Sequence, residues 1–253
     1  MTSTIHTDPY AVSAEFYEVM AIPHWAAKRD VLVAALTGAG AVTEPVLDVG
    51  AGTGLSTVAI ADTIPAVAIH AVEPSAAMRA ALVSRILGRE DLADRVTVHP
   101  AGIEDVDLPD RIGAAVLMGV IGFLDRDARE RLWTQLRHRI TPRAPVVVEV
   151  MAIDRPMPVP EMTIAEQRIG RRHNEVRISG QPAGDGVQRW KMRYQVREND
   201  QIVRDVTAEY VWHTVGFAEL AEEAEKHAMT LRQLHPLIGV LHARNSHQTT
   251  SDH

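Results

Sequence analysis

Short apolar runs alternate with longer segments of helical periodicity through residues 46–151. Apolar runs without polar alternation predict strands that are covered on both faces. Strands that alternate with helices predict parallel pairing through right-handed crossovers. The predicted strands cover residues 46–49, 67–72, 96–98, 114–120 and 145–151, and the predicted helices cover residues 55–64, 75–87 and 127–140.

Residues 11–36 precede this region and are expected to be helical, because apolar residues recur every three or four positions. Pro23 disfavours the helical conformation at Ile22, so the segment is expected to break there. The sequence Thr37-Gly38-Ala39-Gly40 is expected to end the last of these helices.

The pattern changes after residue 151. Residues 152–186 are rich in Pro and Gly and are expected to form a loop with a helix over residues 164–174. Residues 187–212 predict a hairpin with Asn199-Asp200-Gln201 as a three-residue loop. This register opposes Trp190 to Tyr210, Met192 to Ala208, Tyr194 to Val206 and Lys191 to Glu209, whereas a shift by one residue would oppose apolar to charged positions.

The last part of the chain returns to a helix, over residues 217–227, and two strands, over 229–234 and 237–243. The polar tail is expected to be disordered. These patterns divide the chain into an N-terminal helical lid (1–40), a core (41–151), an inserted cap (152–213), a closing helix and strand pair (214–244) and the tail (245–253).

Composition restricts the function. The chain has 253 residues, a net charge of −7 and no cysteine. The negative charge argues against a nucleic-acid substrate, and the missing cysteines exclude disulfides and thiolate chemistry. No signal-like segment and no apolar run of about 18 residues is present, so a cytoplasmic protein without membrane contact is expected. The histidines lack metal-ligand spacing, so no metal is predicted.

The sharpest motif is Leu47-Asp48-Val49-Gly50-Ala51-Gly52-Thr53-Gly54, between a predicted strand and a predicted helix. Glycines at alternate positions leave no Cβ where the backbone turns, so a ligand can approach the main chain. Glu73 lies 21 residues after Gly52, at the end of the next strand. A carboxylate there can accept hydrogen bonds from both hydroxyls of a ribose. The motif predicts an adenosine cofactor, and a tight turn without a ligand is the structural alternative.

Two kinds of cofactor compete for this motif. Dinucleotide sites usually have G-x-G-x-x-G, with a helix N-terminus facing the pyrophosphate. This chain has G-x-G-x-G preceded by Asp48, whose charge would repel a pyrophosphate. S-adenosylmethionine (SAM) carries an ammonium and a sulfonium, which suit an acidic site. We therefore expect SAM, and the alternative role of Asp48 is that of a capping or turn carboxylate.

Residues 46–151 resemble the core of class I SAM-dependent methyltransferases. The resemblance rests on the glycine motif, Ala71-Val72-Glu73-Pro74, Ala101-Gly102-Ile103-Glu104-Asp105 and Val116-Leu117-Met118-Gly119-Val120-Ile121. Residues 214–243 resemble the closing helix and antiparallel strand pair of that family. Residues 1–36 and 152–212 look like the entry helices and inserted cap of small-molecule methyltransferases of bacterial natural-product pathways. The resemblance implies an α/β, Rossmann-like seven-stranded sheet, mostly parallel with one antiparallel strand, with SAM as cofactor and S-adenosylhomocysteine (SAH) as product.

The resemblance also implies roles for individual residues. Gly50, Gly52 and Gly54 would line the methionine half of SAM, and Met118 and Gly119 would present backbone near its ammonium. Glu73 would hold the ribose hydroxyls, Ser75 and Met78 would lie beside the adenine, and Ile103 would offer its backbone to the ring. Further candidates for cofactor contact are Asp48, Ala51, Pro74 and Gly102. Many relatives have an Asp where this chain has Gly102, so Glu104 is expected to substitute for it.

Methyl transfer needs alignment and a dry site, and a general base only if the acceptor is still protonated. The candidate bases are His24, Tyr17, His173 and His213. Tyr17 is also a candidate for cofactor contact, and Arg29 for pairing with the SAM carboxylate. The candidate acceptor contacts are Trp25, Met151, Trp190, Tyr194 and Tyr210. For the aromatic residues, packing within helix or hairpin is the alternative.

A basic cluster contains Arg168, Arg171, Arg172 and His173, with Arg177, Arg189, Lys191 and Arg193 nearby. A solvated face, recognition of an acidic substrate and RNA contact are the three interpretations. The favoured partner is a small-molecule methyl acceptor, and a homodimer is one option for the assembly. The rival functions are a SAM-fold cyclase or regulator, an RNA or protein methyltransferase, and a nicotinamide-dependent oxidoreductase.

Overall fold

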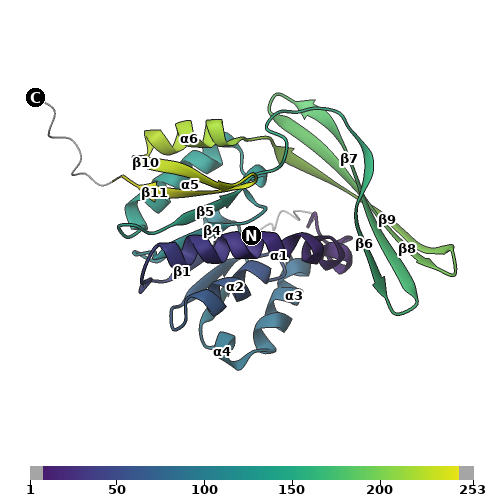
Figure 1. Cartoon of the computed structure of the whole chain (residues 1–253), viewed down its shortest axis with the longest axis horizontal. Helices are drawn as coiled ribbons and strands as arrows, with labels where there is room; N and C mark the ends of the chain where they lie inside the picture. Colours follow the sequence, from purple (N-terminus) through teal and green to yellow (C-terminus); the bar gives the residue numbers. More distant parts are fainter. Residues whose placement is uncertain (1–7, 245–253) are drawn as a thin grey trace, which may run out of the picture.

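Seven strands form one sheet in the order β10-β11-β5-β4-β1-β2-β3 (Figure 1). The structure is a computed structural model, and it describes residues 8–244, so the predicted tail lies outside the described residues. The strands are β1 (Val46–Val49), β2 (Ile69–Val72), β3 (Val96–His99), β4 (Ala114–Leu117), β5 (Val146–Glu149), β10 (Met229–His235) and β11 (Ile238–Ala243). Strand β11 pairs antiparallel with both β5 and β10, whereas the pairs between β5, β4, β1, β2 and β3 are parallel. The predicted fold class is confirmed.

Helices cover both faces of this sheet because successive strand residues point to opposite faces. On one face Leu47 and Val49 pack with Trp133 of α5 and Leu220 of α6. On the other face Val46 packs with residues of α1, α2 and α3. The helices are α1 (Ala14–Gly38), α2 (Leu55–Thr63), α3 (Ala76–Leu87), α4 (Glu90–Ala93), α5 (Arg126–Arg139) and α6 (Phe217–Lys226), with 3₁₀ turns η1 (Ile103–Asp105) and η2 (Ile121–Phe123).

Helix α1 is one continuous helix, so the predicted break at Pro23 is wrong. A proline inside a helix removes one backbone hydrogen bond, which packing on both sides can offset. Phe16 and Val19 pack against the cap before Pro23, and Leu32 and Leu36 pack against the sheet after it. The helix thus spans both parts of the molecule (Figure 1), and it ends at Gly38, as the sequence predicts.

A second sheet, of four antiparallel strands, extends away from the core (Figure 1). Its strands are β6 (Val159–Ile169), β7 (Arg172–Gly184), β8 (Val187–Glu198) and β9 (Gln201–His213). The predicted helix over residues 164–174 is wrong, because β6 and β7 form a hairpin there. Gly170 has φ +59° between the paired residues Ile169 and Arg172, as expected for glycine at the first central position of a type II′ turn.

The predicted register of β8 and β9 is confirmed, with Trp190 opposite Tyr210, Met192 opposite Ala208 and Lys191 opposite Glu209. The loop is shorter than predicted, since Glu198 pairs with Gln201. Asn199 and Asp200 form the turn with φ of 49° and 62°, as in a type I′ turn. The pairing shifts by one residue between Val196, which lies opposite Arg204, and Arg197, which lies opposite Ile202. This bulge in β9 compensates for the loop being one residue shorter than predicted. None of the described helices is long and apolar enough to cross a membrane.

Candidate functional site

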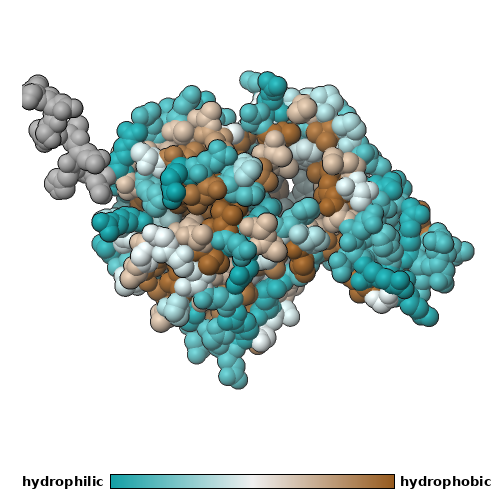
Figure 2. Space-filling view, viewed as in Figure 1, coloured by the Kyte–Doolittle hydropathy of each residue, from teal (hydrophilic) through white to brown (hydrophobic). Residues whose placement is uncertain are grey.

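The carboxyl ends of β1, β2, β4 and β5 meet at one edge of the core sheet, where open parallel sheets bind their ligands. Gly50 follows β1, Glu73 follows β2 and Met118 follows β4, while Glu149 is the last residue of β5. Helix α1 passes over this edge toward the cap, and Figure 2 shows a hollow bordered by hydrophobic residues between core and cap.

The three motif glycines all have positive φ, at 67° for Gly50, 57° for Gly52 and 91° for Gly54. They serve different purposes. A Cβ on Gly50 would lie 2.7 Å from Cγ2 of Val120, and one on Gly54 would lie 2.7 Å from Cδ1 of Leu82. A Cβ on Gly52 would meet nothing closer than the Tyr17 hydroxyl at 3.8 Å. Only Gly52 therefore has open space above it, whereas Gly50 and Gly54 allow close packing of the loop.

The Glu73 carboxylate joins the glycine loop to the start of α3. Its Oε2 accepts the N–H of Gly52 at 2.9 Å, and its Oε1 accepts the N–H of Ser75 at 2.7 Å. Burial raises the pKa of Glu73, and these two N–H groups oppose that effect. An ionised carboxylate has about four acceptor positions, so two remain for a ligand.

Asp48 lies beneath the loop rather than at its mouth. The side chain is fully buried, and its Oδ2 accepts hydrogen bonds from Ser56 Oγ at 2.9 Å and Thr57 Oγ1 at 2.6 Å. It supports the first turn of α2, so the structure corrects the expected contribution to an acidic mouth and favours the turn-carboxylate alternative. Oδ1 has no partner among the described residues, and burial raises the pKa of Asp48 to about 6.

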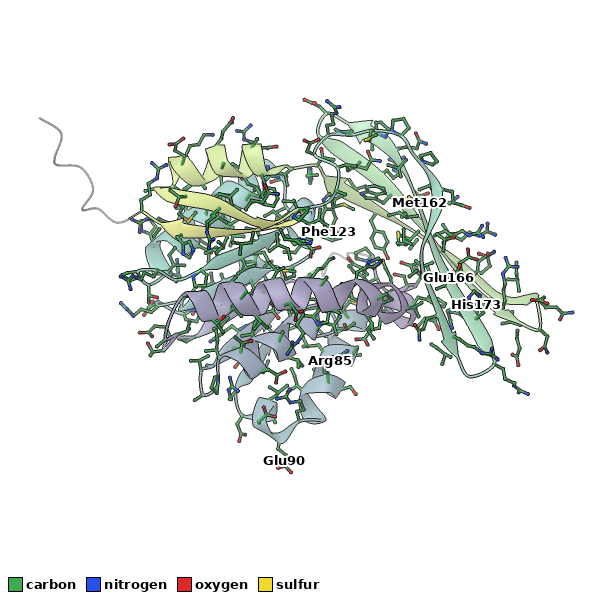
Figure 3. The ribbon with its side chains drawn as sticks, in the orientation of Figure 1. Arg85, Glu90, Phe123, Met162, Glu166 and His173 are labelled. Atoms are coloured by element: carbon green, nitrogen blue, oxygen red, sulfur yellow. The ribbon has the colours of Figure 1, made fainter. Side chains whose placement is uncertain are left out.

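Helix α1 is fixed over the glycine loop by Arg85 of α3 (labelled in Figure 3). Its Nε donates to the carbonyl of Thr53 at 2.8 Å, and its guanidinium also pairs with Glu18 of α1. The neighbouring Tyr17 hydroxyl thereby reaches Gly52. Burial raises the pKa of Tyr17, and the charges of Glu149 and Glu73 raise it further. The phenol is therefore neutral at pH 7 and can donate a hydrogen bond.

Lys28, which no sequence motif indicates, faces the site where Arg29 was expected. Lys28 Nζ lies 2.5 Å from Oε1 of Glu149, whose side chain is only 9% exposed. Arg29 is 42% exposed and lies 3.9 Å from Asp30 and 4.0 Å from Asp62. A Cβ on Gly119 (φ +66°) would lie 3.9 Å from Oε2 of Glu149. The structure thus places the Lys28–Glu149 pair beside the end of β4.

The expected adenine side lies around the start of α3. Ser75 caps this helix by accepting the N–H of Met78 at 3.2 Å, and its hydroxyl donates to Oδ2 of Asp8 at 2.8 Å. Asp8, which no sequence motif indicates, also accepts the N–H of Ala77. The Glu104 carboxylate packs against Gly102, 2.7 Å from the position of an added Cβ. The other residues expected near the cofactor are Met78, Ile103 and Ala51, which are buried, Met118, which is half-buried, and Pro74, which is exposed.

Aromatic residues gather where the cap meets α1 and η2. The chain has four Tyr, and all of them lie in this group. Tyr10 lies 6.1 Å from Tyr17 and 5.2 Å from Tyr210 between ring centroids, and Tyr210 shares a 2.5 Å hydrogen bond with Ser13. Phe16 of α1 stacks on Tyr194 at 5.1 Å. The remaining members are Phe123 (labelled in Figure 3), Trp212 and Trp190.

Most of these rings are core rather than free surface. Trp190, Tyr194 and Tyr210 are buried in the interface between cap and α1, so the packing alternative describes them. Met151 is half-buried against the same cluster, after the end of β5. Trp25 packs against the core on the sheet side of α1.

The candidate histidines do not meet the glycine loop. His24 is exposed and its Nε2 lies 3.0 Å from the carbonyl oxygen of Ile164 in β6. His173 lies on the outer part of the cap with Glu166, whose Oε2 is 3.5 Å away (Figure 3). His213 ends β9 opposite Val187, at the other side of the cap sheet. None of the three is brought into contact with Tyr17, Glu73 or Glu149.

The basic cluster is largely neutralised by acidic neighbours. Arg172 Nε lies 3.2 Å from Glu198, and Arg193 Nη2 lies 2.6 Å from Asp205. Arg177 pairs with both Glu161 and Glu175. The solvated-face interpretation therefore fits best. Among residues 8–244 no group of three or more acidic or histidine side chains could hold a metal ion.

Residues 46–143 match a protein family described as "Methyltransferase domain". The fold is similar to that of a SAM-bound amino pentose methyltransferase from Micromonospora echinaspora, with 18% identity over 86% of this chain and 91% of the other and a TM-score of 0.71. It is also similar to DesVI of Streptomyces venezuelae (16% identity, 90% and 98% coverage, TM-score 0.70). A third similar structure is a sugar N-methyltransferase from Streptoalloteichus (17% identity, 87% and 88% coverage, TM-score 0.66).

Proposed function

We propose that this chain, whose residues 46–143 match the methyltransferase domain, transfers the methyl group of SAM to a small molecule. The observation that carries the proposal is the linked pair Gly52 and Glu73, beneath the hydroxyl of Tyr17. Gly52 provides open space for a thioether chain, and Glu73 retains acceptor capacity for two ribose hydroxyls. The fold and the family match support the same conclusion.

The residues present fit SAM. A Cβ at Gly52 would fill the space above the loop, and Gly119 leaves similar room at the end of β4, where it is exposed. Ser75, Ile103 and Glu104 would border the adenine. The carboxylates of Glu73 and Glu149 make the site acidic around one ammonium, that of Lys28, which suits a ligand with a positive sulfonium.

When bound, SAM supplies a methyl group already activated by its sulfonium, so the protein mainly provides alignment and exclusion of water. Helix α1 covers the loop edge, and the buried rings where it meets the cap help to exclude water from it. The neutral Tyr17 hydroxyl can hold the acceptor by a hydrogen bond. His24, His173 and His213 do not contact Tyr17, Glu73 or Glu149, and His99 at the end of β3 pairs with His70. We therefore expect the reaction to proceed without a histidine base.

We propose residues 152–213 as the cap that determines the acceptor. Met151 and the Tyr17 hydroxyl border the space between core and cap, and we propose that the acceptor binds there. The similar structures include an amino pentose methyltransferase and a sugar N-methyltransferase. Amino sugars are therefore the first class of acceptor to test. Pairing of the basic cluster with acids supports a small molecule over RNA.

The proposal is tested by isothermal titration with SAH and NAD. We expect SAH to bind in the micromolar range and to raise the melting temperature, with no effect of NAD. Incubation with SAM and an aminated sugar panel, followed by mass spectrometry, then reports SAH and a methylated product. Binding of NAD instead of SAH would contradict the proposal. Binding of SAH without turnover on any acceptor would favour a cyclase or regulator.

A further inference from the structure

The Lys28–Glu149 ion pair joins two elements at the cofactor edge. Lys28 comes from α1 and Glu149 from the end of β5, and the two charged atoms lie 2.5 Å apart. The Glu149 side chain is 9% exposed, and that of Lys28 is 28% exposed. Neither side chain makes another hydrogen bond within residues 8–244. The ammonium has three donors and the carboxylate about four acceptor positions, so most of their bonding capacity is open.

The position of the pair relates it to the cofactor loop. Oε2 of Glu149 lies 3.9 Å from where Gly119 would carry a Cβ, so the carboxylate borders the open backbone at the end of β4. The charge of Glu149 raises the pKa of Tyr17 more than any other charge does, and the Tyr17 hydroxyl borders Gly52. The contact of Tyr17 with Gly52 and that of Glu149 with Gly119 therefore lie at the same edge of the sheet, after β1 and β4.

We propose that Lys28 and Glu149 form the binding subsite for the amino-acid end of SAM, a proposal that rests on the function proposed above. An amino acid is a zwitterion, and an ion pair presents the complementary charges. Glu149 would accept the α-ammonium and Lys28 would donate to the α-carboxylate. Without a ligand the two side chains neutralise each other, which lessens the cost of holding a poorly solvated carboxylate.

The pair could instead serve only as a brace between α1 and β5, or Glu149 could bind the methyl acceptor. Ligands that differ at one end separate these cases. SAH contains the amino-acid end, whereas 5′-methylthioadenosine has the same adenosine and thioether without it. If the pair binds the zwitterion, its loss weakens the binding of SAH and leaves the binding of 5′-methylthioadenosine unchanged.

The test is titration calorimetry of Lys28→Met and Glu149→Gln with both ligands. Each variant loses one charge-assisted interaction with SAH, so we expect its Kd for SAH to rise about tenfold or more. Its Kd for 5′-methylthioadenosine should stay within about twofold of the parent value. The matched control is the exposed pair Lys226 and Glu130, with Nζ and Oε1 3.5 Å apart. Lys226→Met and Glu130→Gln should change neither Kd.

The double variant Lys28→Glu with Glu149→Lys separates a subsite from a brace. It keeps an ion pair between α1 and β5 but reverses both charges, so the melting temperature should stay close to that of the parent while SAH affinity falls. Equal weakening of both ligands, or unchanged SAH affinity in all variants, would overturn the inference. If the parent protein bound neither ligand, the proposed function itself would fail.

Discussion

Glu73 accepts the backbone N–H of Gly52 at 2.9 Å, across 21 residues of sequence. This hydrogen bond ties the loop after β1 to the end of β2. Because the other oxygen of Glu73 accepts the N–H of Ser75, one carboxylate holds the glycine loop and the start of α3 in a fixed relation. The two strongest sequence motifs of the chain are therefore one structural unit.

Replacement of Glu73 should weaken both adenosine ligands. Glu73→Ala removes the acceptor for the ribose and for Gly52, so we expect the Kd for SAH and for 5′-methylthioadenosine to rise roughly 10- to 100-fold. Calorimetry measures this effect, with Glu90→Gln on the exposed surface of α4 as control (Figure 3). Unchanged affinity for both ligands would refute the ribose role.

Two neighbouring glycines should respond differently to alanine. At Gly52 the φ of +57° costs about 1–2 kcal/mol, but the space is open, so Gly52→Ala should fold and lose SAH affinity. At Gly50 the added Cβ also meets Val120 at 2.7 Å, so Gly50→Ala should lower the melting temperature further. The additional change Val120→Ala should recover part of that loss. Similar melting temperatures for the two single variants would contradict this assignment.

The buried Arg129 should be essential to the packing of α5 on α6. Its Nη2 lies 2.7 Å from Oε1 of the fully buried Glu223, which also accepts the Trp133 indole N–H at 2.9 Å. Arg129→Met leaves a buried carboxylate unpaired, so we expect a loss of about 3–5 kcal/mol in urea unfolding. The double variant Arg129→Met with Glu223→Leu should recover most of it. A double variant as unstable as the single one would count against this explanation.

The buried Asp48 should make stability depend on pH. Its pKa is raised from 3.8 to about 6, so its contribution to stability is fully present below 3.8 and is lost as pH rises through 6. Asp48→Asn keeps an acceptor for Ser56 and Thr57 without the charge. The free energy of unfolding of the variant, relative to the parent, should therefore increase between pH 4 and pH 7, by on the order of 2 kcal/mol.

Urea unfolding at several pH values measures this difference. Asp94→Asn, at an exposed position, serves as the control and should give a curve parallel to that of the parent. If Asp48→Asn also ran parallel to the parent, burial of the charge would not be the cause.

Local sequence patterns were sufficient to predict the strands of the core sheet. Uninterrupted apolar runs indicate strands covered on both faces, and the glycine loop and Glu73 lie at strand ends, whose position follows from the direction of parallel strands. The alternation in β8 and β9 likewise specified which residues face each other, because a shift by one residue would exchange the buried and the exposed face.

The cap and the acceptor side depended on contacts that are distant in sequence. β6 and β7 are strands because they pair with each other and with β8, whereas the Pro- and Gly-rich sequence favoured a loop with a helix there. Likewise, nothing near Lys28 indicates that it, rather than Arg29, meets Glu149. A helix turns by about 100° per residue, so neighbouring residues point in different directions, and the packing of α1 decided which one enters the site.

The sequence by itself determined the order of strands and helices in the core, the cofactor loop and the acidic residue that follows it, since these depend on periodicity and on backbone geometry at a few glycines. Only the tertiary structure decided that Asp48 lies beneath the loop, that α1 passes Pro23 unbroken and that Lys28 pairs with Glu149. Burial and charge pairing arise where distant segments meet, and local sequence does not specify which segments those are.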